Sequence, residues 1–284
     1  MSDVVKLRWA DITRFRELAQ WLPKVDFPIS APSNPELLLL LAGRSKNLDF
    51  FDKFADKRVE YRLEHVLPPE HLYFRGVNSQ ALNADLCVAF GGTSSATADA
   101  CWLAELLAEI VAEERGIVIS GGAVGVDSAA HLGALNKEGS TVAVLGQPLE
   151  KGLAHAFEAS RYYLEKGIRE SGGLASEYSE ATGTLGERVL GRDRIITALA
   201  DAFVAIECRH DSATVETAKR AWIQKRKVFA VQWSFISSQW QRPESTGNVQ
   251  LFREMIAQPV PSRPVQTLKE VGDEFRKIVR DLRK

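Results

Sequence analysis

The sequence has no apolar run of the length that a membrane span needs. A transmembrane helix takes about 20 consecutive apolar residues, whereas the apolar segment Leu38–Ala42 is far shorter. The segment also follows no basic stretch of the kind that opens a signal peptide. We therefore expect no membrane partner and a cytoplasmic location.

Cysteine is scarce, and positive charge is not in excess. The three cysteines, Cys87, Cys101 and Cys208, are odd in number and lack metal-ligand spacing. This favours reduced thiols, and we expect no metal and no cofactor. Lys and Arg number 36 against 37 Asp and Glu, a net charge of −1, so no global positive field indicates a nucleic-acid partner. A local basic pocket stays compatible with this balance, because binding follows local charge.

From Leu86 onwards, apolar runs alternate with amphipathic segments. Strands that are apolar throughout and separated by helices indicate a parallel sheet covered on both faces. The predicted fold class is therefore α/β, with a doubly wound, mostly parallel Rossmann-like sheet. The predicted strands cover residues 86–90, 117–119, 141–145, 173–176, 202–206 and 228–231, and the predicted helices cover residues 96–114, 128–136, 154–170, 192–200 and 215–224.

Three regions follow from this pattern. Residues 1–82 lack the alternation of strands and helices and are predicted to form a small helical N-terminal domain. Its helices are expected at residues 11–22, 36–42 and 47–54. Residues 83–258 form the Rossmann-like domain. Residues 259–284 hold a linker and an amphipathic C-terminal helix, whose basic end fits the helix macrodipole, with contact to DNA as the alternative.

The strongest candidate for a ligand site is the turn Ser120-Gly121-Gly122. An apolar strand enters this turn and an Ala-rich helix leaves it. Such turns present free backbone N–H groups to an anion, and glycine lets a ligand come close to the backbone. A tight strand-to-helix turn without a ligand is the structural alternative.

Other predicted strand ends carry small residues too. Ligands of open α/β sheets bind beyond the carboxyl ends of the strands, where this chain has Gly91-Gly92-Thr93 and Gly146. If the first two predicted strands are neighbours, the glycines of their turns lie side by side. We predict that amides of these turns bind phosphate.

The best source of positive charge for such a site is the pair Arg192 and Arg194. On an extended loop or a first helical turn, two arginines at i and i+2 can straddle a phosphodiester, each with a forked donor. The alternative is an arginine packed against a carboxylate. Asp193, which lies between the two, dilutes the charge.

Four further residues are candidates for acid–base chemistry. Asp127 and His131 lie four apart on one helical face, as an acid–base pair or as a hydrogen bond that ties the glycine turn to its helix. Glu207 and Glu216 lie at or near a strand end, where each could be a general base or the partner of an arginine. No nucleophile accompanies them, so we assign no catalytic residue.

Six segments in order resemble the DprA/Smf family of DNA-processing proteins. The segment 120–131, SGGAVGVDSAAH, is similar to SGxAxGIDxxAH, and 192–196, RDRII, is similar to RNRII. The other four are 141–146, 172–177, 212–218 and 228–231. The matches run from about Leu86 to Val231, roughly half of the chain.

The resemblance implies an extended Rossmann fold that binds and protects single-stranded DNA and helps to load a RecA-type recombinase. It also implies a role in natural transformation or recombination, a homodimer, and no catalysis. Phosphates would lie at the glycine turns and on Arg192 and Arg194. This chain departs from the family where Thr93 replaces an arginine and where Asp193 replaces an asparagine.

A second resemblance is to the lysine-decarboxylase-like nucleotide phosphoribohydrolases of the same superfamily. There Arg192 and Glu216 would act on the sugar of a nucleoside monophosphate. The PGGxGT glycines of that family are absent around residues 209–214. A sensor that binds a nucleotide without turnover is a third hypothesis.

Overall fold

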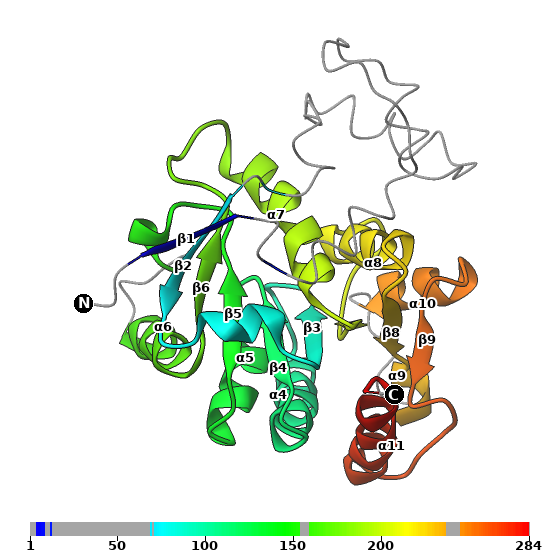
Figure 1. Ribbon diagram of the computed structural model, residues 1–284. Coiled ribbons are helices and arrows are strands. Elements are labelled where there is room, and N and C mark those ends of the chain that lie inside the picture. The colour runs from blue at the N-terminus through cyan, green and yellow to red at the C-terminus, as the bar shows by residue number, and fades with distance from the viewer. Residues whose placement is uncertain are drawn as a thin grey trace.

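The computed structural model describes residues 4–8, 12, 69, 71–153, 159–236 and 245–283. Within this part the strands form one nine-stranded sheet in the order β1-β2-β6-β5-β4-β3-β7-β8-β9 (Figure 1). Neighbours from β6 to β9 pair in parallel, whereas β1 pairs antiparallel with β2, and β2 with β6. The strands are β1 (Val5–Arg8), β2 (His71–Gly76), β3 (Cys87–Gly91), β4 (Ile117–Ser120), β5 (Thr141–Val144), β6 (Gly173–Ser176), β7 (Ala202–Ala205), β8 (Lys227–Val231) and β9 (Gln258–Val260).

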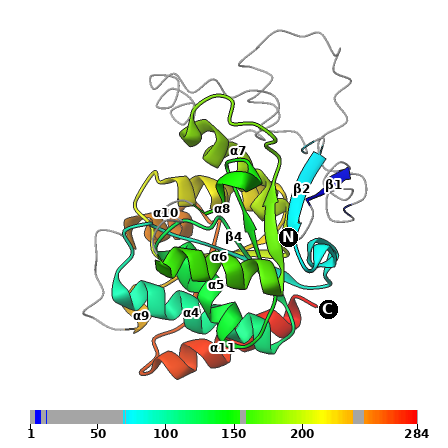
Figure 2. The same ribbon diagram turned by 90° about the vertical axis from the view of Figure 1, so that its left-hand side faces the viewer.

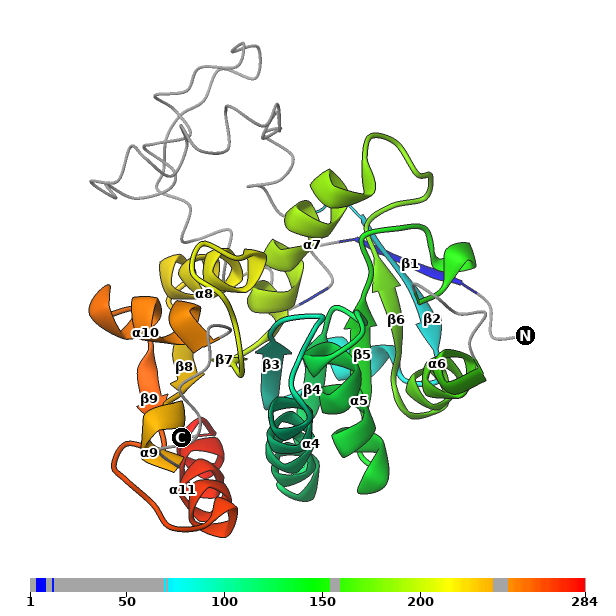
Figure 3. The ribbon, with the colours of Figure 1, turned by 180° about the vertical axis from the view of Figure 1, so that it is seen from behind.

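Helices cover both faces of the sheet, which confirms the doubly wound α/β fold. Figures 1 and 3 show α7, α8 and α10 on one side and α4, α5 and α11 on the other. On that second side α6, α5, α4 and α11 pack against one another in this order (Figure 2). The α-helices of the described residues are α4 (Ala98–Glu113), α5 (Val126–Asn136), α6 (Ala159–Ser171), α7 (Leu185–Leu199), α8 (Ala213–Ile223), α9 (Trp233–Ile236), α10 (Thr246–Arg253) and α11 (Leu268–Asp281), and 3-10 helices cover Ser79–Asn83 and Leu149–Lys151.

The core consists of two apolar layers because successive residues of a strand point to opposite faces. In β3, Ala89 packs with α7 and α8, while Val88 and Phe90 pack with α4 and α5. All the residues of β4 to β7 are buried. These strands are apolar at nearly every position because both of their faces are buried, and this pattern is what predicted a parallel sheet.

The chain reverses its direction of travel across the sheet at β3. The strands β3 to β6 follow one another toward one end, and α7 then carries the chain back to β7 on the other side of β3. The carboxyl ends of β3 and β7 therefore flank a topological switch point, where open α/β sheets bind ligands. Helix α7 packs across β3, β4 and β5 at this place.

Strands were not predicted within residues 1–82, yet β1 and β2 lie there and extend the sheet from β6. The pairing of Phe74 with Ala175 brings this segment into the Rossmann core, where Leu72 and Phe74 are buried. The helices predicted at residues 11–22, 36–42 and 47–54 lie outside the described residues, apart from Ile12. The division at residue 82 stays a prediction.

The C-terminal helix is confirmed as α11, which begins with a capping box at Thr267. Arg276 and Arg280, two residues of its basic end, form ion pairs with Glu114, which follows α4, and Arg276 also pairs with Glu113, the last residue of α4. The elements α9, α10 and β9 were not predicted. Among the described residues, none of the helices combines the length and the apolar character that crossing a bilayer would need.

Candidate nucleic-acid interface

Two glycine turns lie side by side at the carboxyl edge of the sheet. Strands β3 and β4 are parallel neighbours, so Gly91-Gly92-Thr93 and Ser120-Gly121-Gly122 leave the same edge at adjacent positions. The Ser120 hydroxyl donates to the Phe90 carbonyl oxygen at 2.8 Å and ties the two strand ends together. The predicted neighbourhood of the two turns is confirmed.

Several amides of these turns have no hydrogen-bond acceptor within the described part of the chain. The Thr93 amide donates to Glu207 O, and the Ala123 amide donates to Asp127 Oδ2. No acceptor among the described residues meets the amides of Gly92, Gly121 and Gly122. Open donors at a strand end that leads into a helix are the arrangement that binds a phosphate oxygen.

A buried arginine on α6, Arg161, holds the second turn from its other side. Its guanidinium donates to the carbonyl oxygens of Gly122 and Ala123 and to the hydroxyl of Ser128. Gly122 has a φ of 71°, which a side chain would strain. Because the carbonyls of the turn face Arg161, their orientation is fixed.

Arg192 lies against the backbone of the same turn. It is only 6% exposed, and a Cβ at Gly121 would clash with its guanidinium, so any side chain at this position would have to displace the end of Arg192. Nη1 donates to the Val144 carbonyl oxygen at 2.6 Å, and Nε lies 3.0 Å from Asp193 Oδ1. The hydrogen bonds among the described residues use Nη1 alone.

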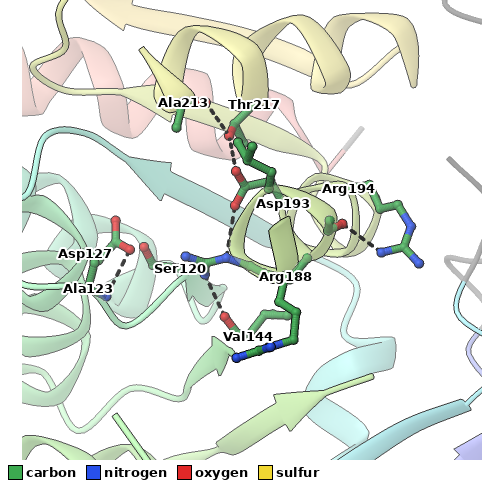
Figure 4. A network of polar contacts seen from close by, with 12 residues as sticks. Ser120, Ala123, Asp127, Val144, Arg188, Asp193, Arg194, Ala213 and Thr217 are labelled. Carbon is green, nitrogen blue, oxygen red and sulfur yellow. Dashed lines mark hydrogen bonds and ion pairs between the residues drawn. The ribbon is translucent and has the colours of Figure 1, made fainter. Parts of the chain in front are cut away.

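Two buried carboxylates accompany this guanidinium. Asp193 accepts a hydrogen bond from the Thr217 hydroxyl at 3.0 Å, and Asp127 accepts from the Ala123 amide (Figure 4). Burial raises the pKa of both carboxyl groups, while the charge of Arg192 acts in the opposite direction. The site therefore contains a cation between two carboxylates.

Arg194 points elsewhere, which corrects the predicted local geometry. Both arginines lie in the middle of α7 and not on an extended loop or first turn, because α7 begins at Leu185. Positions i and i+2 of a helix project about 200° apart. Arg194 forms a two-pronged ion pair with Glu177, at 2.7 and 2.6 Å, and Figure 4 shows it directed away from Ser120 and Asp127. The structure does not bring the pair together at one phosphate.

Gly146, at the end of β5, has a packing role in the structure. A Cβ there would meet the backbone of Val189 at the start of α7. The Gly146 carbonyl oxygen accepts from Arg188 Nε at 2.9 Å, and Arg188 also donates to the carbonyl oxygens of Thr182 and Gly183. Arg188 thus joins this strand end to the loop that follows β6.

Glu207 and the Asp127–His131 pair have structural contacts. Glu207 is buried and accepts from the amide and hydroxyl of Thr97, so it stabilises the beginning of α4. His131 contacts Thr141 at 2.7 Å and not Asp127. Burial lowers the pKa of His131 to about 3, so the ring is neutral at pH 7. The hydrogen bond from Ala123 to Asp127 matches the structural alternative, in which this helix anchors the glycine turn.

Glu216 faces α10 and has no contact with Arg192 among the described residues. Lys219 Nζ lies 3.8 Å from its carboxylate and 3.1 Å from that of Glu254. Burial raises the pKa of Glu216 to about 7. The pairing of Arg192 with Glu216 that phosphoribohydrolase chemistry would need is not found in the described structure.

Sequence reasoning missed Arg161 and Arg188. Each binds carbonyl oxygens of loops that are distant in sequence, up to 42 residues away for Arg188. A single arginine on an amphipathic helix carries no local signal of such a role.

The comparisons with known proteins agree on the family. The family model described as DNA recombination-mediator protein A matches residues 54–272. A Mycobacterium tuberculosis relative is 38% identical over 147 residues, which are 52% of this chain and 37% of that protein. The DNA processing protein DprA of Streptococcus pneumoniae is 32% identical over 124 residues, 44% of this chain and 43% of that protein. The chain thus spans less than half the length of these two relatives.

Solved structures share the fold. DNA processing protein A from Helicobacter pylori, described for its single-stranded DNA binding mode, has a TM-score of 0.61 at 24% identity and covers 75% of this chain and 89% of its own. DprA from Streptococcus pneumoniae has a TM-score of 0.59 at 23% identity, with 88% and 89% covered. The chain therefore belongs to the DNA recombination-mediator protein A family, that of the DprA and Smf proteins.

Proposed function

We propose that this chain binds single-stranded DNA at the carboxyl edge of β3 and β4 and breaks no bond in it. The observation that carries this proposal is the contact of the Arg192 guanidinium with Gly121, beside amides that have no acceptor among the described residues. A phosphate at this edge would accept from those amides and from Arg192. Binding through the backbone predicts little sequence preference and a marked dependence on salt.

The family supports DNA as the ligand. The Helicobacter pylori relative is described as a binder of single-stranded DNA. We extend the proposal to the processing of DNA in recombination or natural transformation, with protection of single strands and loading of a RecA-type recombinase by a homodimer. A phosphate at Arg194 would have to displace the Glu177 carboxylate that pairs with this guanidinium.

The test is a fluorescence-anisotropy titration of the full chain with a labelled oligothymidine at several salt concentrations. Arg192→Ala should weaken binding about tenfold and reduce the salt slope by about 0.7, the loss of one phosphate contact on a single strand. Arg115→Ala removes the same charge from an exposed position before β4, at the opposite edge of the sheet, and should bind as the unmodified chain does. Equal affinities for all three proteins would place the DNA elsewhere.

Competition by nucleoside monophosphates tests the alternative ligands. Displacement of the oligothymidine by micromolar nucleotide would favour a nucleotide sensor. Release of a free base, abolished by Glu216→Ala, would favour a phosphoribohydrolase. We expect no release of base, because Glu216 contacts Lys219 near α10 and not the Arg192 site. We also expect no displacement by nucleotide, because the Helicobacter pylori relative is described as a binder of single-stranded DNA.

A further inference from the structure

The Arg192 guanidinium is already engaged by a negative charge of its own helix. Asp193 Oδ1 lies 3.0 Å from Arg192 Nε, and both side chains are more than nine-tenths buried. Asp127, also buried, adds a second carboxylate close enough to interact electrostatically with Arg192. The negative charge of Asp193 in this ion pair offsets that of the guanidinium, so less positive charge remains to attract a phosphate.

The carboxylates of Asp127 and Asp193 accept hydrogen bonds from different parts of the structure. Asp127 accepts the Ala123 amide and so holds the glycine turn on α5. Among the described residues, the Asp193 carboxylate accepts a hydrogen bond from the Thr217 hydroxyl and none from the backbone of the turn, and Thr217 also contacts the Ala213 carbonyl oxygen of its own helix at 2.8 Å. The backbone of the turn therefore depends on Asp127 and not on Asp193.

We propose that Asp193 is an affinity-determining residue, a built-in counter-anion that weakens the phosphate site by competing for Arg192. This inference rests on the proposed function, because it concerns the same guanidinium. A ligand phosphate must share Arg192 with Asp193, and it gains less from the contact than it would from a free guanidinium. The arrangement limits how tightly the chain holds a DNA strand.

An opposite role for Asp193 would give the opposite result. If the carboxylate mainly orients Arg192 toward Gly121, its removal should misplace the guanidinium and weaken binding. If it mainly competes for the charge, its removal should strengthen binding. The isosteric change Asp193→Asn separates the two, since the amide oxygen keeps an acceptor for Thr217 while the negative charge is lost.

The experiment is an oligothymidine titration of Asp193→Asn at several salt concentrations. We expect binding about tenfold tighter, with the salt slope steeper by about 0.7, as for one additional phosphate contact. The double variant Arg192→Ala/Asp193→Asn should lose this gain, because the freed charge resides on Arg192. If Asp193→Asn does not fold, as judged by circular dichroism, Asp193→Ser serves in its place.

The matched control is Asp201→Asn. It removes one carboxylate at the amino edge, where Asp201 accepts the Cys87 amide at 2.7 Å, and an asparagine oxygen can accept there too. Its affinity should equal that of the unmodified chain. A gain in affinity as large as that of Asp193→Asn would show that the change in net charge alone tightens binding, and it would overturn the proposal.

Two failures remain distinguishable. If Arg192→Ala weakens binding but Asp193→Asn leaves it unchanged or weakens it, the counter-anion role is wrong and the DNA site stands. If the unmodified chain and Asp193→Asn both fail to bind the oligonucleotide, the proposed function and the inference fall together.

Discussion

Arg192 and Arg194 lie two residues apart on α7 and are equally buried, at 6% exposure, but their surroundings differ. Both terminal nitrogens of Arg194 pair with the carboxylate of Glu177, and one also meets the Gly191 carbonyl oxygen. Arg192 contacts one carbonyl oxygen, the side of Asp193 and the backbone of a glycine turn.

The difference follows from helix geometry. Because residues i and i+2 project about 200° apart, one guanidinium turns toward the end of β6 and the other toward the turn after β4. The two-pronged ion pair engages both terminal nitrogens of the Arg194 guanidinium, as a structural arginine does. Arg192 makes fewer hydrogen bonds among the described residues, and it is the arginine that we propose for the ligand.

The largest expected effect on stability comes from breaking the ion pair of Arg194 with Glu177. Glu177→Ala leaves the Arg194 guanidinium buried without its carboxylate, which should lower the free energy of unfolding by about 3 to 5 kcal/mol. Urea unfolding followed by circular dichroism measures the loss. Glu180→Ala, an exposed glutamate of the same loop, should change stability by less than about 0.5 kcal/mol. A loss as small for Glu177→Ala would refute the structural role of the pair.

Glu216 is a buried acid whose cationic neighbour, Lys219, lies farther away than Arg194 lies from Glu177. Its folded-state pKa, about 7, exceeds the ordinary value of 4.5, so the folded state binds the proton more tightly than the unfolded state does. The stabilising effect of that proton is complete below pH 4.5 and is lost as the pH rises through 7. The total loss is about 3 kcal/mol.

Glu216→Gln removes this titration. The free energy of unfolding of the unmodified chain, relative to that of the variant, should fall between pH 4.5 and pH 8. Parallel urea titrations across this range measure the difference. A constant difference would show that Lys219 already compensates the ionised carboxylate in the folded state.

The central sheet could be predicted because its strands carry their signal locally. Apolar runs such as Val88–Phe90 are buried on both faces, and glycines follow them. Strands β1, β2 and β9 escaped prediction because they lie at or near the ends of the sheet, and their pairing partners are distant in sequence. The Val5–Arg8 strand does alternate apolar and charged residues, V-K-L-R, but a run of four residues is a weak signal, and of these four Leu7 alone is partly buried.

Of the candidate site, the neighbouring positions of the two glycine turns could be predicted, whereas the directions of its side chains could not. Glycine turns are local features, whereas the contact of Arg192 with Gly121 depends on the path of α7 over the sheet. The error on Arg194 arose from placing the helix start at residue 192. A capping box formed by Thr184 and Glu187 marks the true start, and its T-x-x-E pattern is visible in the sequence.

Arg161 offers a way to loosen the glycine turn beside Arg192 without changing Arg192 itself. Arg161→Ala removes charge-assisted hydrogen bonds to the turn carbonyls of Gly122 and Ala123 and should lower the free energy of unfolding by about 2 kcal/mol. The released turn should also bind oligothymidine about threefold more weakly. Lys166→Ala, an exposed change on the same helix, is the control for both measurements. Unchanged DNA affinity in a destabilised Arg161→Ala would show that the turn does not contact DNA.

The smallest expected effect sharpens the comparison most, because it moves Arg192 without removing it. In Gly121→Ala a methyl group takes the place of the guanidinium, which is the flexible end of a side chain and can shift. The backbone tolerates alanine, since the φ of Gly121 lies outside the left-handed region. Stability should therefore fall by no more than about 1 kcal/mol, whereas oligothymidine affinity should fall about threefold.

Gly186→Ala is the matched control for that change. It adds the same methyl group within α7, where a Cβ would have no neighbour within 4 Å, and alanine should stabilise the helix by up to about 1 kcal/mol. Its DNA affinity should stay the same. Equal affinities of both alanine variants would mean that the position of the Arg192 guanidinium does not matter to the ligand, and the distinction between the two arginines of α7 would then be one of packing alone.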